Sequence, residues 1–329
     1  MNIRHLSFRL LQVYIQTVRS ASISAAARAL HLTQPTVSLQ LKKLADEVGE
    51  ALFVSRDGRM VTTPVGDELY RAACDVIGRF DDFNGFLDHA RGGHSGTLSI
   101  GIVTTAKYVV PRILGGFYRQ SPGVNVTLNI GNRAHILDRF ARQEDDLYVF
   151  SHPPTGASVQ ARRILSNPLQ VIAPLEHWSA GLRQLSFEQL RGERFLIREP
   201  GSATRMMLEA WLIGHGLELG ATMQIESNEA IRLAVAAGLG LSVISAHTLQ
   251  EGRERLAVLP VDGFPLESNW YLVCRKDRRL QQAAMQLIGF MAGHLQHCVD
   301  PALVAPDIAT LAQYFSSGAV AGHERRRLE

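Results

Sequence analysis

The sequence predicts an α/β protein that begins with an all-α winged helix-turn-helix, continues through a long linker helix and ends in a two-lobed, doubly wound domain. Three observations predict this. Three short helical patterns are followed by a hairpin pattern, then by one long helical pattern, and after residue 97 by β-branched runs that alternate with helical stretches. We therefore expect a winged module at 1–63, a linker helix at 64–94, a two-lobed domain at 95–299 and a partly disordered tail at 300–329.

The composition is ordinary for a globular chain. The 329 residues are 46% hydrophobic and 20% charged, and no stretch approaches the roughly 20 consecutive apolar residues of a membrane span. The first residues do not form the pattern of a secretory signal. The three cysteines, Cys74, Cys274 and Cys298, are too few and too dispersed for a disulfide framework. We expect a reduced, cytoplasmic protein that has no membrane partner.

Basic charge is concentrated near the N-terminus. Residues 1–65 contain eight basic and four acidic side chains, a net charge of +4, whereas the other 26 basic and 27 acidic residues leave −1. This distribution is expected if one small module meets polyanionic DNA and the rest of the chain does not. A chance asymmetry of a few charges is the alternative explanation.

The winged module is predicted element by element. Apolar spacing indicates a helix over 5–19, and Ser22 or Ser24 can cap a second helix over 25–30. A break at 31–33 is followed by a third helix, with Thr33 as its cap and Pro35 in its first turn, where proline is tolerated. Gly49 ends this helix.

The third helix carries short polar and basic side chains outside its buried stripe of Val37, Leu41, Leu44 and Val48. Two helices joined by a three-residue turn, with such side chains on the second helix, are typical of a helix-turn-helix. Apolar runs at 52–54 and 60–62 flank an Asp-Gly pair at 57–58, which is a strong hairpin signal. The hairpin is therefore the predicted wing.

A long helix is predicted to start at Thr63-Pro64. Its apolar residues recur in steps of four and three, which is typical of a seam that pairs with another helix. We expect the partner to be the same helix of a second copy, although packing on its own domain is the alternative. The seam residues are Val65, Leu69, Ala72, Val76, Phe80, Phe83, Leu87 and Ala90. A flexible joint is expected at 91–96.

From residue 97 onward, short strands and helices alternate, which indicates parallel sheets covered by helices on both faces. About two hundred residues with two such sets suggest two lobes, and such sheets bind ligands beyond the carboxyl ends of their strands. Strands are expected at 98–103, 124–130, 147–150, 169–173, 195–197, 223–225, 241–244 and 270–274, and helices at 108–120, 133–142, 186–191, 202–214, 228–237 and 280–296.

The chain resembles the LysR-type transcriptional regulators. The segments that carry the resemblance are AAARALHLTQPTVS at 25–38, ALFVSR at 51–56 and TPVG at 63–66, and the match extends to about residue 298. Within this family, the segments TTAKY at 104–108, NIGNR at 129–133, DDLY at 145–148, FLIREPGSATR at 195–205 and SNEAI at 227–231 resemble regulators of Calvin-cycle (RuBisCO) operons and of inorganic-carbon uptake.

The resemblance implies a periplasmic-binding-protein-like effector domain and a homodimer or, as is common in the family, a homotetramer. It also implies an activator of carbon-fixation genes that binds promoter DNA and RNA polymerase. The implied co-inducer is a small anionic metabolite, such as a sugar bisphosphate, phosphoglycolate or a reduced nicotinamide nucleotide, with no cofactor. Whether the protein activates or represses transcription stays open at this point.

DNA contacts are expected from the third helix and the wing. Gln34 can pair with adenine in the major groove, and Pro35 and Thr36 can contact a thymine methyl group. Ser38 and Lys42 share a face that suits phosphates or base edges. The resemblance favours Gln34, Pro35 and Ser38 as base readers, while Leu39 stands where several relatives have a basic residue. The predicted DNA-binding residues are Thr33, Gln34, Pro35, Thr36, Ser38, Lys42, Arg56 and Arg59, with the two arginines suited to the minor groove.

An anion site is expected in the two-lobed domain. Hydroxyl and basic residues follow the first strand at 104–107, and the segment 201–205 likewise lies between a strand and a helix. Amides at a helix N-terminus together with hydroxyls and a cation bind phosphate or carboxylate, and Arg133 and Arg198 can add bidentate contacts. Capping by Ser202 and Thr204, and pairing of Arg198 with Glu199, are the structural alternatives. The predicted effector-binding residues are Thr104, Thr105, Lys107, Arg133, Arg198, Ser202, Thr204, Arg205 and Asn228.

The sequence gives little support for a catalytic function. The G-x-S-x-G, G-x-x-x-x-G-K and H-E-x-x-H motifs are absent from the sequence, and His294, His297 and Cys298 are better explained as a helix surface than as metal ligands. Two alternatives stay open. One is a LysR-type regulator of bicarbonate-transport or respiratory genes, and the other is a cytoplasmic solute-binding or enzymatic α/β protein with an oligomerisation arm.

Overall fold

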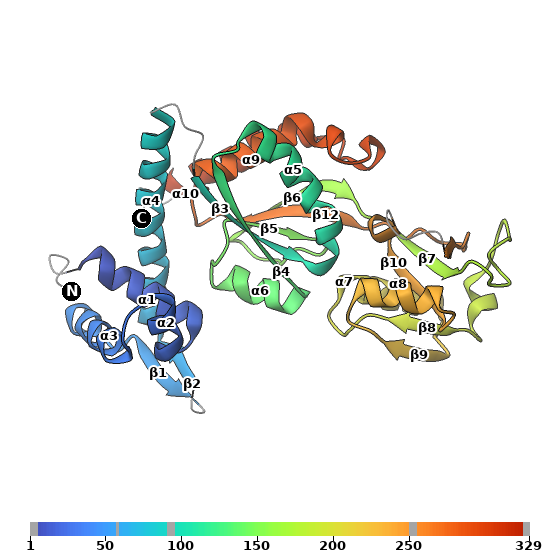
Figure 1. Ribbon diagram of the computed structural model, residues 1–329, viewed down its shortest axis with the longest axis horizontal. Coiled ribbons are helices and arrows are strands. Elements are labelled where there is room, and N and C mark those ends of the chain that lie inside the picture. The colour runs from blue at the N-terminus through green and yellow to red at the C-terminus, as the bar shows by residue number, and fades with distance from the viewer. Residues whose placement is uncertain (1–5, 57–58, 91–95, 250–254, 325–329) are drawn as a thin grey trace. The chain divides into compact units, whose positions relative to one another are not determined.

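The computed structural model describes residues 6–56, 59–90, 96–249 and 255–324. It forms two compact units, residues 1–96 and residues 97–329, and each is described by itself (Figure 1). Within the described residues, no helix combines the length and the apolar character that crossing a bilayer requires.

The first unit starts with three helices, α1 (Phe8–Ser20), α2 (Ile23–Ala29) and α3 (Gln34–Val48). Hydroxyl side chains cap all three, because those of Ser7, Ser22 and Thr33 each accept a hydrogen bond from a backbone N–H of the following turn. Gly49 ends α3 in a left-handed conformation at φ 83°, which glycine adopts without steric cost. The predicted helix-turn-helix is confirmed, with Ser22 rather than Ser24 as the cap of its first helix.

Strands β1 (Phe53–Arg56) and β2 (Arg59–Thr62) pair antiparallel and form the wing. The predicted Asp57-Gly58 tip lies outside the described residues. The wing leads into the long helix α4 (Pro64–Ala90). The joint predicted at 91–96 lies outside the described residues except for Gly96, which begins strand β3 (Gly96–Val103). The start of α4 is fixed tightly: the Tyr14 hydroxyl donates to the Gly66 carbonyl at 2.7 Å, and a Cβ at Gly66 would lie 2.3 Å from the Leu52 carbonyl oxygen.

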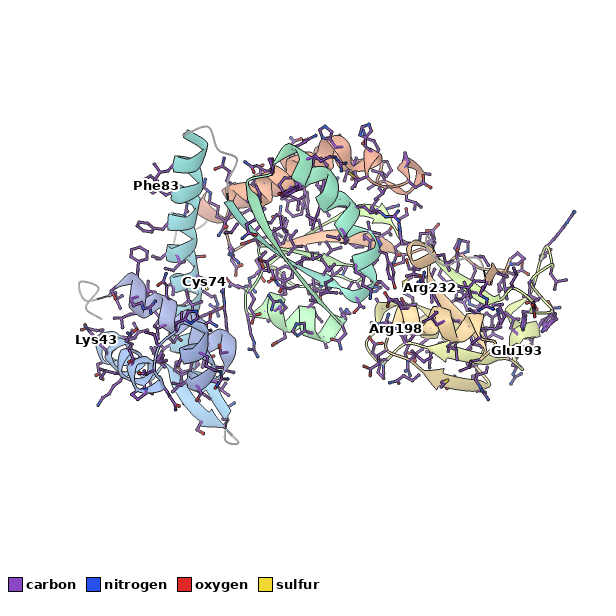
Figure 2. All side chains as sticks on the ribbon, viewed as in Figure 1. Lys43, Cys74, Phe83, Glu193, Arg198 and Arg232 are labelled. Carbon is purple, nitrogen blue, oxygen red and sulfur yellow. The ribbon has the colours of Figure 1, made fainter. Side chains whose placement is uncertain are left out.

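Helix α4 has two different apolar faces. Tyr70, Ala73 and Cys74 are buried in the core of the first unit, together with residues of α1 and α3. Val76, Phe80 and Phe83 are 42–52% exposed, and Phe83 extends from the helix away from that core (Figure 2). The alternative explanation of the helical seam, packing on its own domain, therefore holds for one face of the helix. Pairing with a second copy stays a prediction for the exposed face.

The second unit begins with a lobe built on a five-stranded sheet in the order β4-β3-β5-β12-β6. Helices α5 (Val110–Gln120) and α9 (Gln282–His294) lie on one face of the sheet and α6 (Arg133–Ala141) on the other (Figure 1). The strands are β3 (Gly96–Val103), β4 (Val124–Gly131), β5 (Leu147–Phe150), β6 (Val159–Ser166) and β12 (Asn269–Arg275).

The second lobe has a five-stranded sheet in the order β11-β7-β10-β8-β9. Alternate residues of its strands pack with α7 (Ala203–His215) on one face and with α8 (Asn228–Ala236) on the other, so the sheet is covered on both sides. The strands are β7 (Leu169–Pro174), β8 (Arg194–Ile197), β9 (Ala221–Gln224), β10 (Leu241–Ser245) and β11 (Leu256–Val258).

The two-lobed α/β architecture is confirmed, but its sheets are mixed rather than parallel. Strands β6 and β11, which we did not predict, pair antiparallel with β12 and β7. The chain passes between the lobes twice, and these passages are bonded to each other: the Asn167 N–H donates to the Ser268 carbonyl at 2.7 Å. A strand that returns from the other lobe enters its sheet antiparallel, which the local alternation of strands and helices does not reveal.

The expectation of a partly disordered tail at 300–329 is wrong for its described part. Short 3₁₀ turns at Pro301–Leu303 and Ile308–Thr310 lead into helix α10 (Leu311–Glu324). Leu311 and Phe315 are at most 2% exposed and belong to the core of the first lobe. Tyr314 donates from its hydroxyl to the Ala161 carbonyl at 3.0 Å. Ile308, Leu311 and Phe315 belong to the core of the lobe, and Leu303, Val304, Ala312 and Tyr314 pack against it. Two short 3₁₀ turns interrupt the segment before α10, so these apolar residues follow no single helical period in the sequence.

Candidate functional site

One face of α3 is polar and open. About 100° of rotation per residue brings Gln34, Ser38 and Lys42 onto one side of the helix, opposite the fully buried Val37 and Leu44. Thr33, Gln34, Pro35, Ser38 and Lys42 are exposed and Thr36 is half-buried. All six of these predicted residues therefore lie at the accessible N-terminal half of one helix.

Two pairs of polar groups organise the start of this face. The Thr33 and Thr36 hydroxyls are 2.7 Å apart, and the Ser24 hydroxyl donates to the Gln34 side-chain oxygen at 3.1 Å. The carboxamide of Gln34 is thus held by α2, the helix that precedes the turn. Leu39 is 69% exposed and lies about 100° round α3 from Ser38, so an apolar side chain borders the polar surface.

On the wing, Arg56 is exposed at the end of β1. The backbone of Arg59 begins β2, and its side chain lies outside the described part of the structure. The two arginines pair across the hairpin, since Arg56 stands opposite Arg59 in the strand register.

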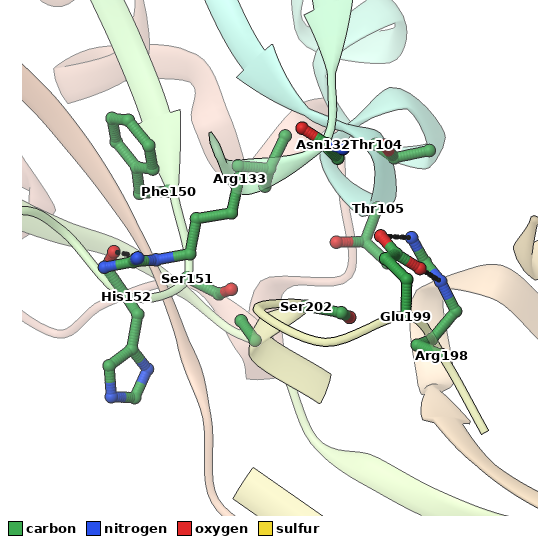
Figure 3. Close-up of a pocket in the computed structure, with 12 residues that line it drawn as sticks. Thr104, Thr105, Asn132, Arg133, Phe150, Ser151, His152, Arg198, Glu199 and Ser202 are labelled. Atoms are coloured by element: carbon green, nitrogen blue, oxygen red, sulfur yellow. Dashed lines mark hydrogen bonds and ion pairs between the residues drawn. The ribbon is translucent and has the colours of Figure 1, made fainter. Parts of the chain in front are cut away.

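A pocket lies between the two lobes of the second unit (Figure 3). It encloses about 320 Å³, part of which is open to solvent. Its walls come from segments that directly follow strands β3, β4, β5 and β8, so the ligand rule for α/β sheets applies. The lining residues are Val103, Thr104, Thr105, Asn132, Arg133, Phe150, Ser151, His152, Arg198, Glu199, Ser202 and Ala203.

Arg133 is the first-lobe cation of the pocket. It begins α6 directly after Asn132, whose side chain caps the helix by accepting from the His135 N–H at 2.9 Å. The Arg133 guanidinium donates from Nε to the His152 carbonyl at 3.4 Å and points towards Ser151 and His152 (Figure 3). Arg133 forms no ion pair among the described residues, so its charge is available to an anion.

Arg198 faces the pocket from the second lobe, and its guanidinium is already engaged. Its Nε and Nη2 donate to the two carboxylate oxygens of Glu199 at 2.8 and 2.9 Å, and its Nη1 donates to the Asn228 side-chain oxygen at 2.6 Å. Arg198 is 4% and Glu199 9% exposed. The structural alternative that we gave for Arg198, pairing with Glu199, is therefore what the structure shows.

Helix N-termini supply further donors on both sides. The 3₁₀ helix Thr104–Tyr108 and α6 begin at the first-lobe wall, and α7 begins at the second-lobe wall. Ser202 is the N-cap residue of α7, yet its side chain makes no cap hydrogen bond, and Figure 3 shows it together with Thr105 at the pocket. Backbone amides and hydroxyls at such ends favour negative charge.

Five of the predicted effector residues line the pocket, namely Thr104, Thr105, Arg133, Arg198 and Ser202. The other four do not. Lys107 pairs with Glu229 at 2.7 Å, Arg205 pairs with Glu209 at 2.6 Å and also donates to the Arg198 carbonyl, and Thr204 is buried in α7. Asn228 contacts the pocket through Arg198 alone among the lining residues. Helical rotation explains the result for Thr204 and Arg205, the second and third residues of α7, because it turns their side chains away from the end of the helix.

The sequence reasoning missed Asn132, Phe150, Ser151, His152 and Glu199. A usable signal was present for Ser151 and His152, which follow the fully buried strand β5 at its carboxyl end. Glu199 was considered only as a partner of Arg198. Among the described residues, no group of three or more histidine, cysteine or acidic side chains could hold a metal ion.

The Lys107–Glu229 pair links the lobes beside the pocket, since Lys107 follows β3 and Glu229 lies in the first turn of α8. Burial would raise the pKa of the Glu229 carboxyl, but neighbouring Lys107, Tyr108 and Ser227 stabilise its charged form, so the pKa falls to about 2. Glu229 is therefore ionised at neutral pH.

Comparison with known proteins extends these observations. Residues 8–67 match the bacterial regulatory helix-turn-helix model of the lysR family, and residues 91–296 match the LysR substrate-binding domain. A RuBisCO operon transcriptional regulator of Acidithiobacillus ferrooxidans is 39% identical, covering 85% of this chain and 91% of the relative. The HTH-type transcriptional activator CmpR of Synechocystis is 38% identical, covering 86% of this chain and 94% of the relative.

Two solved structures are also similar to this chain. The regulatory domain of Synechocystis CcmR in complex with 2-PG is 36% identical, with a TM-score of 0.58, and covers 60% of this chain and 96% of that domain. Full-length CbnR complexed with its target DNA is 17% identical, with a TM-score of 0.59, covers 89% of this chain and 100% of that one, and supports the fold alone. Both family models, these relatives and the winged and two-lobed fold lead to one conclusion: the chain belongs to the LysR family of bacterial transcriptional regulators.

Proposed function

We propose that this regulator activates carbon-fixation genes, such as a RuBisCO operon, in response to a small phosphorylated or carboxylated metabolite. The observation that carries the proposal is the similarity to regulators of this kind in several organisms, which extends over at least 84% of the chain at 34–39% identity in examples such as the Acidithiobacillus protein and CfxR of Cupriavidus necator. Under this proposal the protein acts by binding and not by catalysis.

The first unit reads promoter DNA. The exposed face of α3, with Gln34, Pro35 and Ser38 at its N-terminal half, supports base contacts in the major groove, and Lys42 supports a phosphate contact. Arg56 and Arg59 on the wing are assigned to the minor groove. The exposed Leu39 offers an apolar surface where a basic side chain would add one more contact.

A homodimer forms through α4. Val76, Phe80 and Phe83 leave an apolar stripe on this helix, and pairing with the same stripe of a second copy would remove it from water. Two recognition helices related by a two-fold axis would then read a pseudo-palindromic operator. We further propose that two dimers assemble into a tetramer and that the regulator contacts RNA polymerase, as the family resemblance implies.

The effector binds in the pocket between the lobes. Arg133, the Ser202 hydroxyl and the N-termini of α6 and α7 favour a phosphate or carboxylate there. The Synechocystis CcmR domain, solved with 2-PG, supports a ligand of this class. A ligand that contacts both lobes shifts the equilibrium between their arrangements, and with it the spacing of the DNA-binding units.

The test is a footprint of the full chain on the DNA upstream of its own gene and on a RuBisCO-operon promoter, at several salt concentrations, with each candidate metabolite added in turn. We expect a protected segment whose length changes with one metabolite. The control is DNA of the same length and scrambled sequence. A complete lack of protection under every condition would remove the DNA-binding proposal.

One other regulon has specific support. CmpR, which is 38% identical, is named as a transcriptional activator, and the sequence resemblance includes regulators of inorganic-carbon uptake. Preferential protection of promoters for bicarbonate-transport genes, with none of the RuBisCO promoter, would select this second candidate.

A further inference from the structure

One charge in the effector pocket has the wrong sign for an anion site. Glu199 lines the pocket, and its two carboxylate oxygens accept hydrogen bonds from Nε and Nη2 of the Arg198 guanidinium at 2.8 and 2.9 Å. Both residues are less than 10% exposed. An Arg–carboxylate fork of this geometry is the same contact that an arginine makes with a ligand carboxylate.

The pocket is therefore asymmetric. On the first-lobe wall, Arg133 contacts only a backbone carbonyl in the described contacts, so its charge is available to an anion. On the second-lobe wall, the charge of Arg198 is cancelled by Glu199 (Figure 3). A ligand with one anionic group needs only the first wall, whereas a second anionic group would meet Glu199.

The surroundings hold the guanidinium in place independently of Glu199. Asn228 is 1% exposed, and its side-chain oxygen accepts a hydrogen bond from Arg198 Nη1 at 2.6 Å. Its side-chain amide nitrogen, Nδ2, has no acceptor among the described residues. In this arrangement, with Glu199 paired to Arg198, the buried N–H donors of the Asn228 side chain therefore lack an acceptor among the described residues. Burying an unpaired donor costs free energy, which weakens this arrangement relative to one that supplies an acceptor.

We propose that Glu199 is an internal substitute for a carboxylate of the effector, and that a ligand carrying a carboxylate together with a phosphate displaces it from Arg198. The inference rests on the proposed effector site and adds a specificity rule to it. The phosphate is held by Arg133 and the helix N-termini, and the carboxylate takes the place of the Glu199 side chain. Glu199 then opposes any ligand whose second group cannot replace its two hydrogen bonds.

The experiment compares two ligands that differ in one group. 2-Phosphoglycolate carries a phosphate and a carboxylate, and 2-hydroxyethyl phosphate carries the phosphate alone. Their dissociation constants are measured by calorimetry on the full-length protein and on Glu199→Gln, which keeps the size of the side chain and removes its charge. We expect the substitution to tighten 2-phosphoglycolate binding about tenfold and 2-hydroxyethyl phosphate binding less than about threefold, because only the first ligand must displace the carboxylate.

The matched control is Glu209→Gln, which removes a carboxylate from another arginine pair of the same lobe, one that does not line the pocket. It should leave both constants unchanged. Weaker binding to Glu199→Gln, or an equal change for the two ligands, would overturn the proposal and assign Glu199 to positioning Arg198. If Glu199→Gln does not fold, Arg198→Lys replaces it, and the proposal requires the loss of affinity to be confined to 2-phosphoglycolate.

The proposed effector class and the proposed role of Glu199 can be disproved separately. If the unmodified protein binds neither ligand nor any other candidate anion, the proposed effector class is wrong. If it binds both ligands and the substitution acts on them equally, the effector site stands and the role assigned to Glu199 does not.

Discussion

The recognition helix and the effector pocket are built in opposite ways. The polar side chains of α3 come from one stretch of nine residues, stand on one face and are largely exposed. The pocket takes its lining from four segments between residues 103 and 203, in two lobes, and two of its charged residues, Arg198 and Glu199, are already paired with each other. The helix face is complete within one element, whereas the pocket exists only where the lobes meet.

This difference affects how each region responds to substitution. An exposed side chain on α3 has few partners, such as the single Ser24 hydroxyl that bonds to Gln34, so its loss reports mainly on the DNA contact itself. A side chain in the pocket belongs to a network, so its loss also releases its partners.

Replacing Arg133 with alanine should have the largest effect. It removes the first-lobe cation of this half-buried position, and the loss of its hydrogen bonds to a charged ligand group costs up to about 3 kcal/mol, or roughly 100-fold in affinity. Calorimetry with 2-phosphoglycolate measures the loss, and Arg142→Ala, at the C-cap of the same helix and outside the pocket lining, is the control. An affinity within a few-fold of the unmodified protein would show that the pocket does not depend on this charge.

Replacing Gln34 with alanine should reduce discrimination between operator and random DNA by about tenfold or more, since a bidentate base contact is worth roughly 1–3 kcal/mol. Gel shifts on both DNAs give the ratio of affinities. Folding should be unaffected because Gln34 is exposed. Equal weakening on both DNAs would contradict base reading by this side chain.

Replacing Lys42 with alanine should weaken operator and random DNA alike, by a few-fold, and lower the salt dependence of binding by about one phosphate contact. The matched control is Lys43→Ala, an exposed lysine about 100° further round the same helix. Gel shifts over a range of salt concentrations measure the slope. A loss confined to the operator would reassign Lys42 to base reading.

Replacing Lys107 with methionine should have the smallest effect. The lowered pKa of Glu229, about 2, contributes stability above its ordinary pKa, and this contribution is lost as the pH falls from about 4.5 towards 2. Because both side chains are partly exposed, at 28% and 39%, the substitution should cost less than about 1 kcal/mol at pH 7.

Denaturant unfolding of the full chain at pH 7 and at pH 2.5 checks this pH dependence, with Lys276→Met, an exposed lysine of the same unit, as the control. The difference between the Lys107 variant and the unmodified protein should shrink at the lower pH. A difference that grows on acidification would mean that the Lys107–Glu229 pair does not stabilise the contact between the lobes.

Much of the fold followed from local patterns. The helix-turn-helix, the wing strands, the long helix and eight of the strands of the second unit were predicted close to their observed bounds, because hydrophobic periodicity and capping residues act within one element. Strands β6 and β11 were missed and the ordered segment after residue 300 was misjudged. In each case a long-range partner, and not the local sequence, decides the structure.

The sequence by itself determined which side chains α3 offers to DNA, because helical geometry places Gln34, Ser38 and Lys42 opposite a buried stripe whatever surrounds the helix. Only the tertiary structure decided the composition of the pocket. It brought Ser151 and Glu199 to the lining, turned Lys107 and Arg205 to carboxylate partners outside it and joined Arg198 to Asn228. The direction of a side chain at a strand end depends on the turn that follows, and this direction decides which partner its charge meets, whether adjacent in the chain, as Glu199 is to Arg198, or distant, as Glu229 is from Lys107.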